Sequence, residues 1–169
     1  MRVRDSQRSK VYAAELRSGM YDPNDKFASF EELRTYARNV LRSEWLNRNY
    51  PVPYWNIRIE YHPQRHGAVT RNGHVLGFGP RALGKQIVLH EIAHLLERSG
   101  AWHGREWARV YVEIVQHFLG VERANKLRAE FRAGKVKYTK PRQYTPEQRE
   151  ALRERGRQLA ASRQPKQEN

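Results

Sequence analysis

The chain has 169 residues, of which 38% are hydrophobic and 11% aromatic, enough for one ordinary domain with a buried core. Its 32 lysine and arginine residues outnumber 18 acidic ones, giving a net charge of +14, and cysteine is absent. This composition excludes disulfides, thiolate metal sites and thiol nucleophiles, and no run of about 18 apolar residues is present to span a membrane. The basic start of the chain precedes no apolar stretch, so we expect no secretory signal and a cytoplasmic location.

Two helices are expected before the first strand. Residues 6–17 predict a helix that ends at Gly19. The apolar side of this helix would consist of Val11, Ala14 and Leu16. Ser29 and Glu32 have the spacing of a capping box, in which each side chain binds a free backbone amide at the start of a helix. Apolar residues then recur at helical spacing, which predicts an amphipathic helix over 30–47.

The strands are expected in the middle of the chain. Residues 57–61 alternate apolar and polar side chains, which is the pattern of a half-buried strand. Residues 68–70 and 74–76 flank Asn72-Gly73, a dipeptide typical of tight hairpin turns because both residues tolerate positive φ. These signals predict a small antiparallel sheet of about three strands. A loop is then expected around Gly77, Gly79, Pro80 and Gly84.

Two core helices are expected after the sheet. Residues 85–97 are almost wholly apolar apart from His90, Glu91 and His94, which predicts a helix buried on every side, with Gly100 placed to cap it. Residues 107–118 repeat apolar side chains at the spacing of a second core helix.

These elements predict an α+β fold in which the sheet packs on the first core helix and flanking helices. Residues 1–134 would form a single domain that ends with a shorter basic helix over 121–133. Residues 135–169 would form a basic C-terminal extension, partly helical or disordered, in which one more helix begins near Pro146.

The first core helix carries His90-Glu91-Ile92-Ala93-His94, which matches the pattern H-E-x-x-H. Residues four apart lie one turn from each other on a helix, so both imidazoles face the same side and can share a metal ion. Glu91 is rotated from His90 by about 100°, which is too far for a ligand but within reach of a water activated by the metal. The motif therefore predicts Zn²⁺ as the cofactor and Glu91 as the catalytic general base.

A catalytic zinc needs a third protein ligand and an open fourth position. His103 is the best candidate, because the eight residues that separate it from His94 allow the helix to end and the chain to return. Glu106 and Glu113 are alternatives that would give a site of two histidines and one carboxylate. The remaining histidines are assigned to surface or structural roles: His62, His66, His74 and His117.

Two resemblances follow from these motifs. The string His90-Glu91-Ile92-Ala93-His94-Leu95-Leu96, followed by His103-Gly104-Arg105-Glu106-Trp107, resembles the SprT-like metallopeptidase domain, the family that includes Spartan. This resemblance implies a zincin-like fold, zinc ligands His90, His94 and His103, Glu91 as the base, and cleavage of proteins on or crosslinked to DNA. The opening Arg4-Asp5-Ser6-Gln7-Arg8-Ser9-Lys10-Val11-Tyr12-Ala13-Ala14-Glu15 is similar to a family of metallohydrolases from actinobacteria and their phages whose substrates are unassigned.

The positive charge lies on the flanks of the expected site. Residues 84–120 carry four basic and four acidic side chains, whereas residues 121–169 carry fourteen basic and six acidic ones, a net charge of +8. A basic surface beside a neutral centre is typical of proteins that bind nucleic acid, which we expect as a partner, although a solvated basic surface is the alternative.

Three functions remain open on the sequence. The leading hypothesis is a zinc peptidase with a protein or peptide substrate, which an edge strand aligns through main-chain hydrogen bonds. Val75, Leu76 and Phe78 are candidates for that edge, with a core strand as the other assignment. The alternatives are a zinc hydrolase of a non-peptide substrate and a basic nucleic-acid-binding protein with a structural metal. The sequence gives no indication of the oligomeric state.

Overall fold

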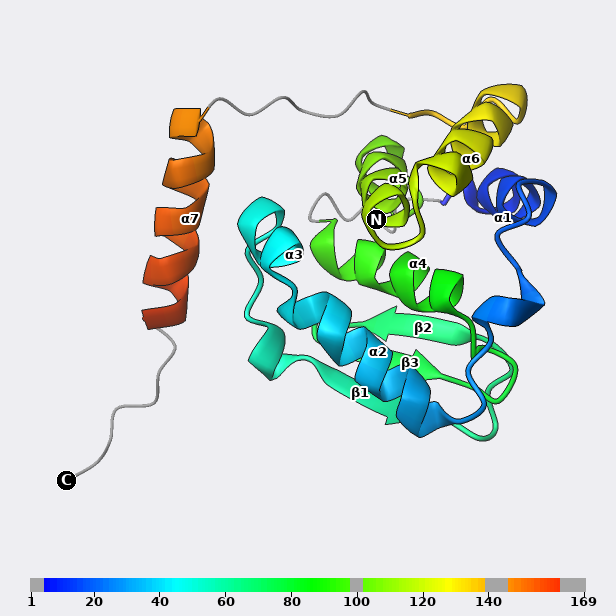
Figure 1. Ribbon diagram of the computed structural model, residues 1–169, viewed down its shortest axis with the longest axis horizontal. Helices are drawn as coiled ribbons and strands as arrows, with labels where there is room; N and C mark the ends of the chain where they lie inside the picture. The colour runs from blue at the N-terminus through cyan, green and yellow to red at the C-terminus, as the bar shows by residue number, and fades with distance from the viewer. Residues whose placement is uncertain (1–4, 98–101, 139–145, 162–169) are drawn as a thin grey trace.

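The structure is a computed structural model, and it describes residues 5–97, 102–138 and 146–161. The described residues form a mixed α+β fold with seven α-helices and one three-stranded sheet (Figure 1). The helices are α1 (Arg8–Arg17), α2 (Phe30–Arg42), α3 (Glu44–Asn49), α4 (Lys85–Leu96), α5 (Arg105–Phe118), α6 (Val121–Ala133) and α7 (Pro146–Ala161). The strands are β1 (Arg58–Tyr61), β2 (Ala68–Arg71) and β3 (Val75–Phe78), and two short 3₁₀ helices span Pro23–Asp25 and Tyr54–Asn56.

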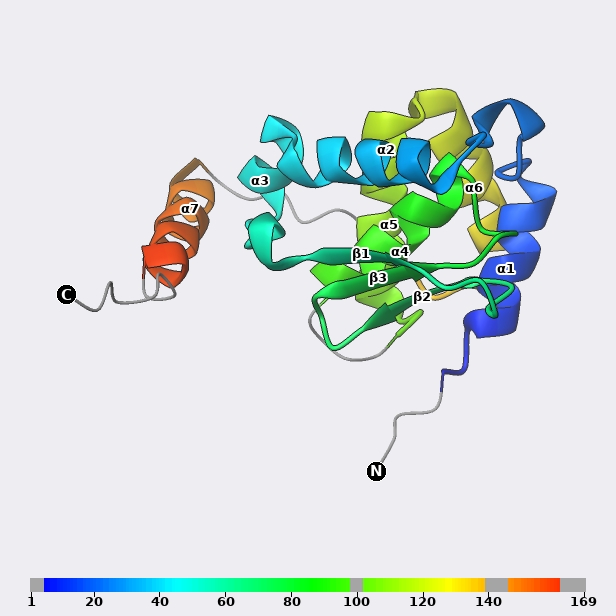
Figure 2. The same ribbon diagram turned by 90° about the horizontal axis from the view of Figure 1, so that it is seen from below.

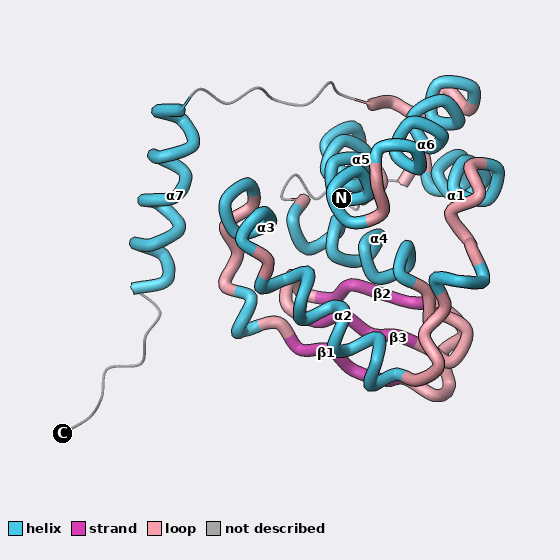
Figure 3. The backbone as a smooth tube through the Cα atoms, in the orientation of Figure 1, coloured by secondary structure: helices cyan, strands magenta, loops and turns pink. Residues whose placement is uncertain are grey.

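The elements are stacked in layers. Figures 1 and 2 show the sheet on one side of the molecule, with α2 and α4 against one of its faces and α5 beyond α4. Helices α1 and α6 pack against each other, and α6 packs on α5. The three strands lie side by side in Figure 3, and α4 contacts the edge strand β2. Helix α4 is therefore enclosed by sheet and helices, as its apolar sequence predicts.

The strand order is β1-β3-β2, and the sheet is mixed rather than antiparallel. Strands β2 and β3 form the expected antiparallel hairpin, with Asn72 at φ 52° and Gly73 at φ 67° in its turn. Strand β1, in contrast, pairs with β3 in parallel. The prediction of an antiparallel sheet was wrong here because the connection over residues 62–67 crosses the end of β3 instead of making a tight turn. This crossing makes β3 the central strand, so the alternative of a core strand for Val75, Leu76 and Phe78 is the correct one.

Three local predictions differ from the structure. The expected helix over 30–47 breaks at Ser43, whose extended backbone (φ −59°, ψ 140°) ends α2 and whose hydroxyl accepts the Leu46 amide at the start of α3. Leu16 is 69% exposed, and the neighbouring Glu15 is buried in its place. Gly77 lies within β3, because the strand continues to Phe78 before the loop begins.

Other local predictions are confirmed. The Ser29 hydroxyl accepts the Glu32 amide at 3.2 Å, and the Glu32 carboxylate accepts the Ala28 amide at 3.0 Å, so both members of the capping box bind backbone amides. Gly100, the expected cap of the first core helix, lies outside the described residues, as do residues 139–145 and 162–169 of the expected extension. Within the described ranges, no helix combines the length and apolar character needed to cross a membrane.

Candidate metal centre

Three histidine side chains converge between α4 and the start of α5. His90 and His94 project from the same side of α4, and His103 lies two residues before α5. The His103 Nε2 atom is 3.0 Å from Nε2 of His90 and 3.2 Å from Nε2 of His94. Within the described residues, these three form the one group of potential ligands whose coordinating atoms all lie within 4.8 Å of one another. The three histidines predicted as ligands are thus brought together, and the arrangement could hold a metal ion.

Aromatic rings pack around the three imidazoles. Trp107, fully buried in the first turn of α5, contacts all three, with ring centroids 4.7 Å from His90, 5.1 Å from His94 and 4.6 Å from His103. Tyr12 of α1 stacks on His90 at 5.6 Å and meets His103 edge-on at 5.4 Å. The Tyr12 side of the cluster borders solvent, since this residue is 39% exposed. Close packing of this kind restricts the rotamers of the ligands and fixes their direction.

Two carboxylates from the N-terminal segment hold the outer nitrogens of two of the histidines. Glu15 Oε1 lies 2.8 Å from Nδ1 of His90, and Asp5 Oδ2 lies 2.6 Å from Nδ1 of His103. An ionised carboxylate can only accept, so each Nδ1 carries a proton and donates it. In the neutral imidazole, the remaining Nε2 then presents its lone pair to the centre of the cluster.

Burial and neighbouring charges shift the pKa values of the three rings in different directions. Burial lowers the pKa of His94 to about 2 and also lowers that of His103, so both rings are neutral near pH 7. Burial acts in the same direction on His90, but the charges of Glu15, Glu91 and other carboxylates outweigh it and raise its pKa. When His90 is protonated, its charge lowers the pKa of the other two rings.

Glu91 lies beside the histidines and is joined to the sheet. Its side chain is 6% exposed, and its Oε2 accepts a hydrogen bond from the Thr70 hydroxyl at 2.7 Å. Burial raises the pKa of the Glu91 carboxyl, while the charge of His90 and the Thr70 hydroxyl act in the opposite direction. The predicted catalytic residue therefore stands next to the ligand cluster, with edge strand β2 fixing its position.

A hollow of about 220 Å³ opens next to His94. Its lining consists of Thr70, Asn72, Gly73, His94, Glu97 and Trp102. Trp102 is 49% exposed and has φ 43°, a backbone conformation that side chains other than glycine rarely adopt and that often marks functional sites. Its ring meets His94 edge-on at 5.6 Å, so both aromatic rings border the same hollow.

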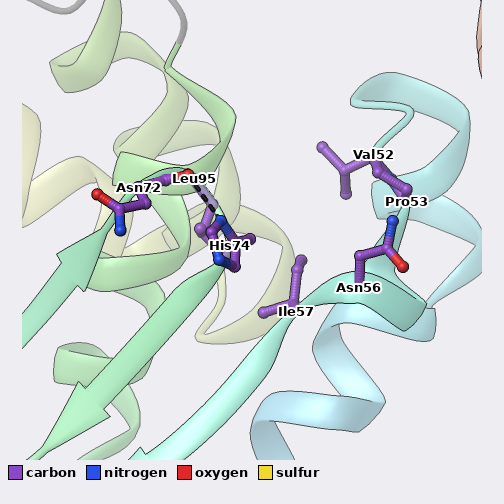
Figure 4. A pocket seen from close by; sticks show the side chains of 8 residues that line it. Val52, Pro53, Asn56, Ile57, Asn72, His74 and Leu95 are labelled. Carbon is purple, nitrogen blue, oxygen red and sulfur yellow. Dashed lines mark hydrogen bonds between the residues drawn. The ribbon is translucent and has the colours of Figure 1, made fainter.

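A second cavity of about 340 Å³ lies on the other side of the hairpin turn and shares Asn72 and Gly73 with the hollow. Figure 4 shows Val52, Pro53 and Asn56 on one side of this cavity, and Asn72, His74 and Leu95 on the other. The His74 ring is held by the Asn72 carbonyl at 2.8 Å.

The alternative ligands are placed elsewhere. Glu106 contacts the Arg109 guanidinium at 3.1 Å, and Glu113 binds Arg109 at 3.0 Å and the Tyr50 hydroxyl. Neither carboxylate belongs to the ligand cluster. The same is true of the four remaining histidines, among which His117 stacks on Trp45 at 4.3 Å.

Sequence reasoning did not assign roles to Asp5, Tyr12, Glu15 and Thr70. The first three fall in the opening string that resembles a metallohydrolase family, and this string was the one available signal for them. Thr70 carried no signal, because its contact with Glu91 depends on how β2 packs against α4.

The chain matches no protein-family model, no curated protein and no solved structure.

Proposed function

We propose that this chain is a zinc-dependent metallopeptidase of the SprT-like, zincin-like kind. The observation that carries this proposal is the convergence of three imidazole Nε2 atoms beside the buried carboxylate of Glu91. Tetrahedral zinc with Zn–N bonds of about 2.0–2.1 Å separates its ligand nitrogens by about 3.3 Å. The separations of 3.0 and 3.2 Å at His103 are close to that value. Three imidazoles without a thiolate are also a donor set typical of catalytic zinc.

The roles of the residues follow from their places. His90, His94 and His103 would hold the metal and leave its fourth position open. A bound zinc ion would supply Lewis-acid polarisation of a carbonyl group and would acidify a water molecule. Glu91 is the proton acceptor for that water, and it can return the proton to the leaving amine. Thr70 holds the Glu91 carboxylate in place at 2.7 Å, so that the base does not have to be ordered during the reaction.

Strand β2 is suited to align an extended peptide. It is an edge strand, it runs next to α4, and its Thr70 already contacts the catalytic carboxylate. A polypeptide added to this edge would make main-chain hydrogen bonds and place alternate side chains toward the site. The hollow beside His94 and Trp102 offers room for one of those side chains. These features favour a peptide bond over other hydrolysable bonds.

The basic composition supports a substrate near nucleic acid. The net charge is +14, and the excess lies outside the neutral stretch 84–120 that contains the ligands. A basic surface attracts the phosphate backbone without base specificity, and its binding weakens as salt increases. We therefore include proteins associated with DNA as the substrate class in this proposal.

The test compares the wild type with His103→Ala, Glu91→Gln and the control His74→Ala, whose exposed ring lies outside the cluster. Metal content and cleavage of an unstructured protein are measured for each, with and without DNA. We expect one zinc per chain in wild type, Glu91→Gln and His74→Ala, and none in His103→Ala. Proteolysis should be lost in Glu91→Gln and His103→Ala, and it should rise with DNA only in the two active proteins.

Each failure of this test has a distinct meaning. A wild type without zinc would refute the metal centre. Zinc without proteolysis would favour a non-peptide substrate, to be sought among nucleotides and esters. Full activity in Glu91→Gln would refute the role of the carboxylate, and tight DNA binding with no catalysis in any protein would favour a structural metal.

A further inference from the structure

Residues 5–15, the N-terminal segment, contact the histidine cluster through several polar and aromatic side chains. Between residues 5 and 15, it places one carboxylate on the outer nitrogen of His103, a second on that of His90, and a tyrosine ring across both. The Gln7 amide also donates to the His103 carbonyl oxygen at 2.8 Å, which fixes the backbone of that ligand. These contacts span 75 to 98 positions in the chain, so they come from the fold and not from local sequence.

From this geometry we infer that Asp5 and Glu15 are positioning residues of the metal centre, each orienting one histidine ligand and fixing which nitrogen of its ring coordinates. This inference rests on the proposed zinc site and adds the residues that determine how tightly the site binds its metal.

The chemistry of the two contacts supports this assignment. A carboxylate that accepts from Nδ1–H leaves Nε2 free to coordinate and increases the basicity of the ring. Glu15 is 1% exposed, and burying a carboxylate in this way is unfavourable unless it is paired. Its position beside His90 is therefore better explained by a function at the ligand than by stability alone. Losing such an outer partner generally weakens metal binding by about 10–100-fold.

The two residues can be tested independently because they act on different ligands. Asp5→Asn and Glu15→Gln preserve size and leave an amide oxygen that can still accept, but they remove the charge. Glu130→Gln is the matched control for Glu15: it breaks the 2.6 Å ion pair between α6 and Arg17 of α1 and leaves the histidines untouched. Asp22→Asn is the control for Asp5, since it removes an ion-paired and similarly exposed aspartate.

The experiment measures the Zn²⁺ dissociation constant by chelator competition, together with the visible spectrum of the Co²⁺-loaded protein. We expect Asp5→Asn and Glu15→Gln each to weaken zinc binding by about 10–100-fold and to alter the Co²⁺ spectrum. Both controls should bind zinc within about twofold of the wild type, and thermal unfolding without metal should show that every variant is folded.

Several results would overturn the inference. Zinc affinity in Asp5→Asn and Glu15→Gln within about twofold of the wild type would do so, as would an equal loss in Glu130→Gln and Asp22→Asn. If Glu15→Gln does not fold, Glu15→Asp replaces it, because this variant keeps the charge and withdraws the carboxylate from His90. Unchanged zinc affinity in Glu15→Asp would also overturn the inference. A wild type that binds no zinc would refute the proposed function instead, which keeps the two failures apart.

Discussion

The Thr70 hydroxyl lies 2.7 Å from the Glu91 carboxylate and 2.9 Å from the Glu91 carbonyl oxygen, so one side chain of the edge strand contacts both the side chain and the backbone of this residue. A hydroxyl has one proton to donate, and its donation to the carboxylate fixes the direction of the group that we propose as the general base.

Replacing Thr70 by valine tests this contact, because valine keeps the shape and removes the hydroxyl. We expect kcat for peptide cleavage to fall by about 10-fold or more, as losses of outer hydrogen-bond partners generally do, while zinc affinity stays unchanged. Thr70→Ser should retain most of the activity. Steady-state kinetics and zinc titration check the prediction. It would be wrong if Thr70→Val and Thr70→Ser had the same kcat.

Metal removal should lower the stability of the protein. Zinc that binds only the folded chain stabilises it by about 4 kcal/mol when free zinc exceeds its dissociation constant by about 1,000-fold. Thermal unfolding with excess zinc and with a chelator measures this difference. His103→Ala should unfold at the same temperature in both conditions, and a zinc-dependent shift retained in that variant would contradict the prediction.

We expect Asp25 to make a pH-dependent contribution to stability through its contact with Lys85, the first residue of α4. It contacts Lys85 at 3.1 Å and is paired with Arg123, and these cations outweigh the effect of burial and lower its pKa below the ordinary 3.8. A carboxylate with a lowered pKa in the fold stabilises it above the unfolded pKa, and this contribution is lost as pH falls through the folded value. Asp25→Asn should lower the free energy of unfolding by about 1–3 kcal/mol at pH 7.

Measuring unfolding at several pH values distinguishes the loss of the Asp25 ion pairs from a general loss of structure. The difference between wild type and Asp25→Asn should be constant above about pH 5 and should shrink as the pH falls below 4. Glu44→Gln, which removes an exposed ion pair with Arg48, is the control and should change little. Urea unfolding at each pH measures both, and a difference that persists unchanged at pH 2 would refute the assignment.

The crossing of residues 62–67 over the end of β3 depends on Gly79. A Cβ atom added there would lie 1.6 Å from the Arg65 carbonyl oxygen, whereas one added at Gly67 would meet nothing within 4 Å. We expect Gly79→Ala to lower the free energy of unfolding by about 3 kcal/mol, because backbone on both sides must move. Gly67→Ala should be within about 1 kcal/mol of the wild type. Equal stability of the two variants, measured in urea, would show that the loop relaxes freely.

The features that the sequence predicted well are those encoded by near neighbours. The hairpin follows from the positive φ that Asn72-Gly73 tolerates, and the face of α4 that carries His90 and His94 follows from helical spacing. His103 could be chosen because its distance along the chain suits a return to the same site. In each case the deciding information lies within about a dozen residues.

The features that the sequence did not predict depend on tertiary packing. The parallel pairing of β1 with β3 is decided by a loop that crosses a strand, which has no local pattern. Serine is common at the start of a helix, but the apolar residues around Ser43 keep the spacing of one continuous helix. The break at Ser43 was therefore not predicted. Glu15 falls where an apolar residue would be expected, and only the fold shows that it faces His90.

The side chain of Gln7 contacts both the His103 carbonyl and the backbone of Lys137, 130 positions along the chain. Helix α1 also packs against α6, so residues 121–137 help to hold the segment that carries Asp5 and Glu15. A chain that lacked these residues would hold the two carboxylates less firmly against His103 and His90. Residues far from the histidines in the sequence would thus influence how well the metal site is ordered.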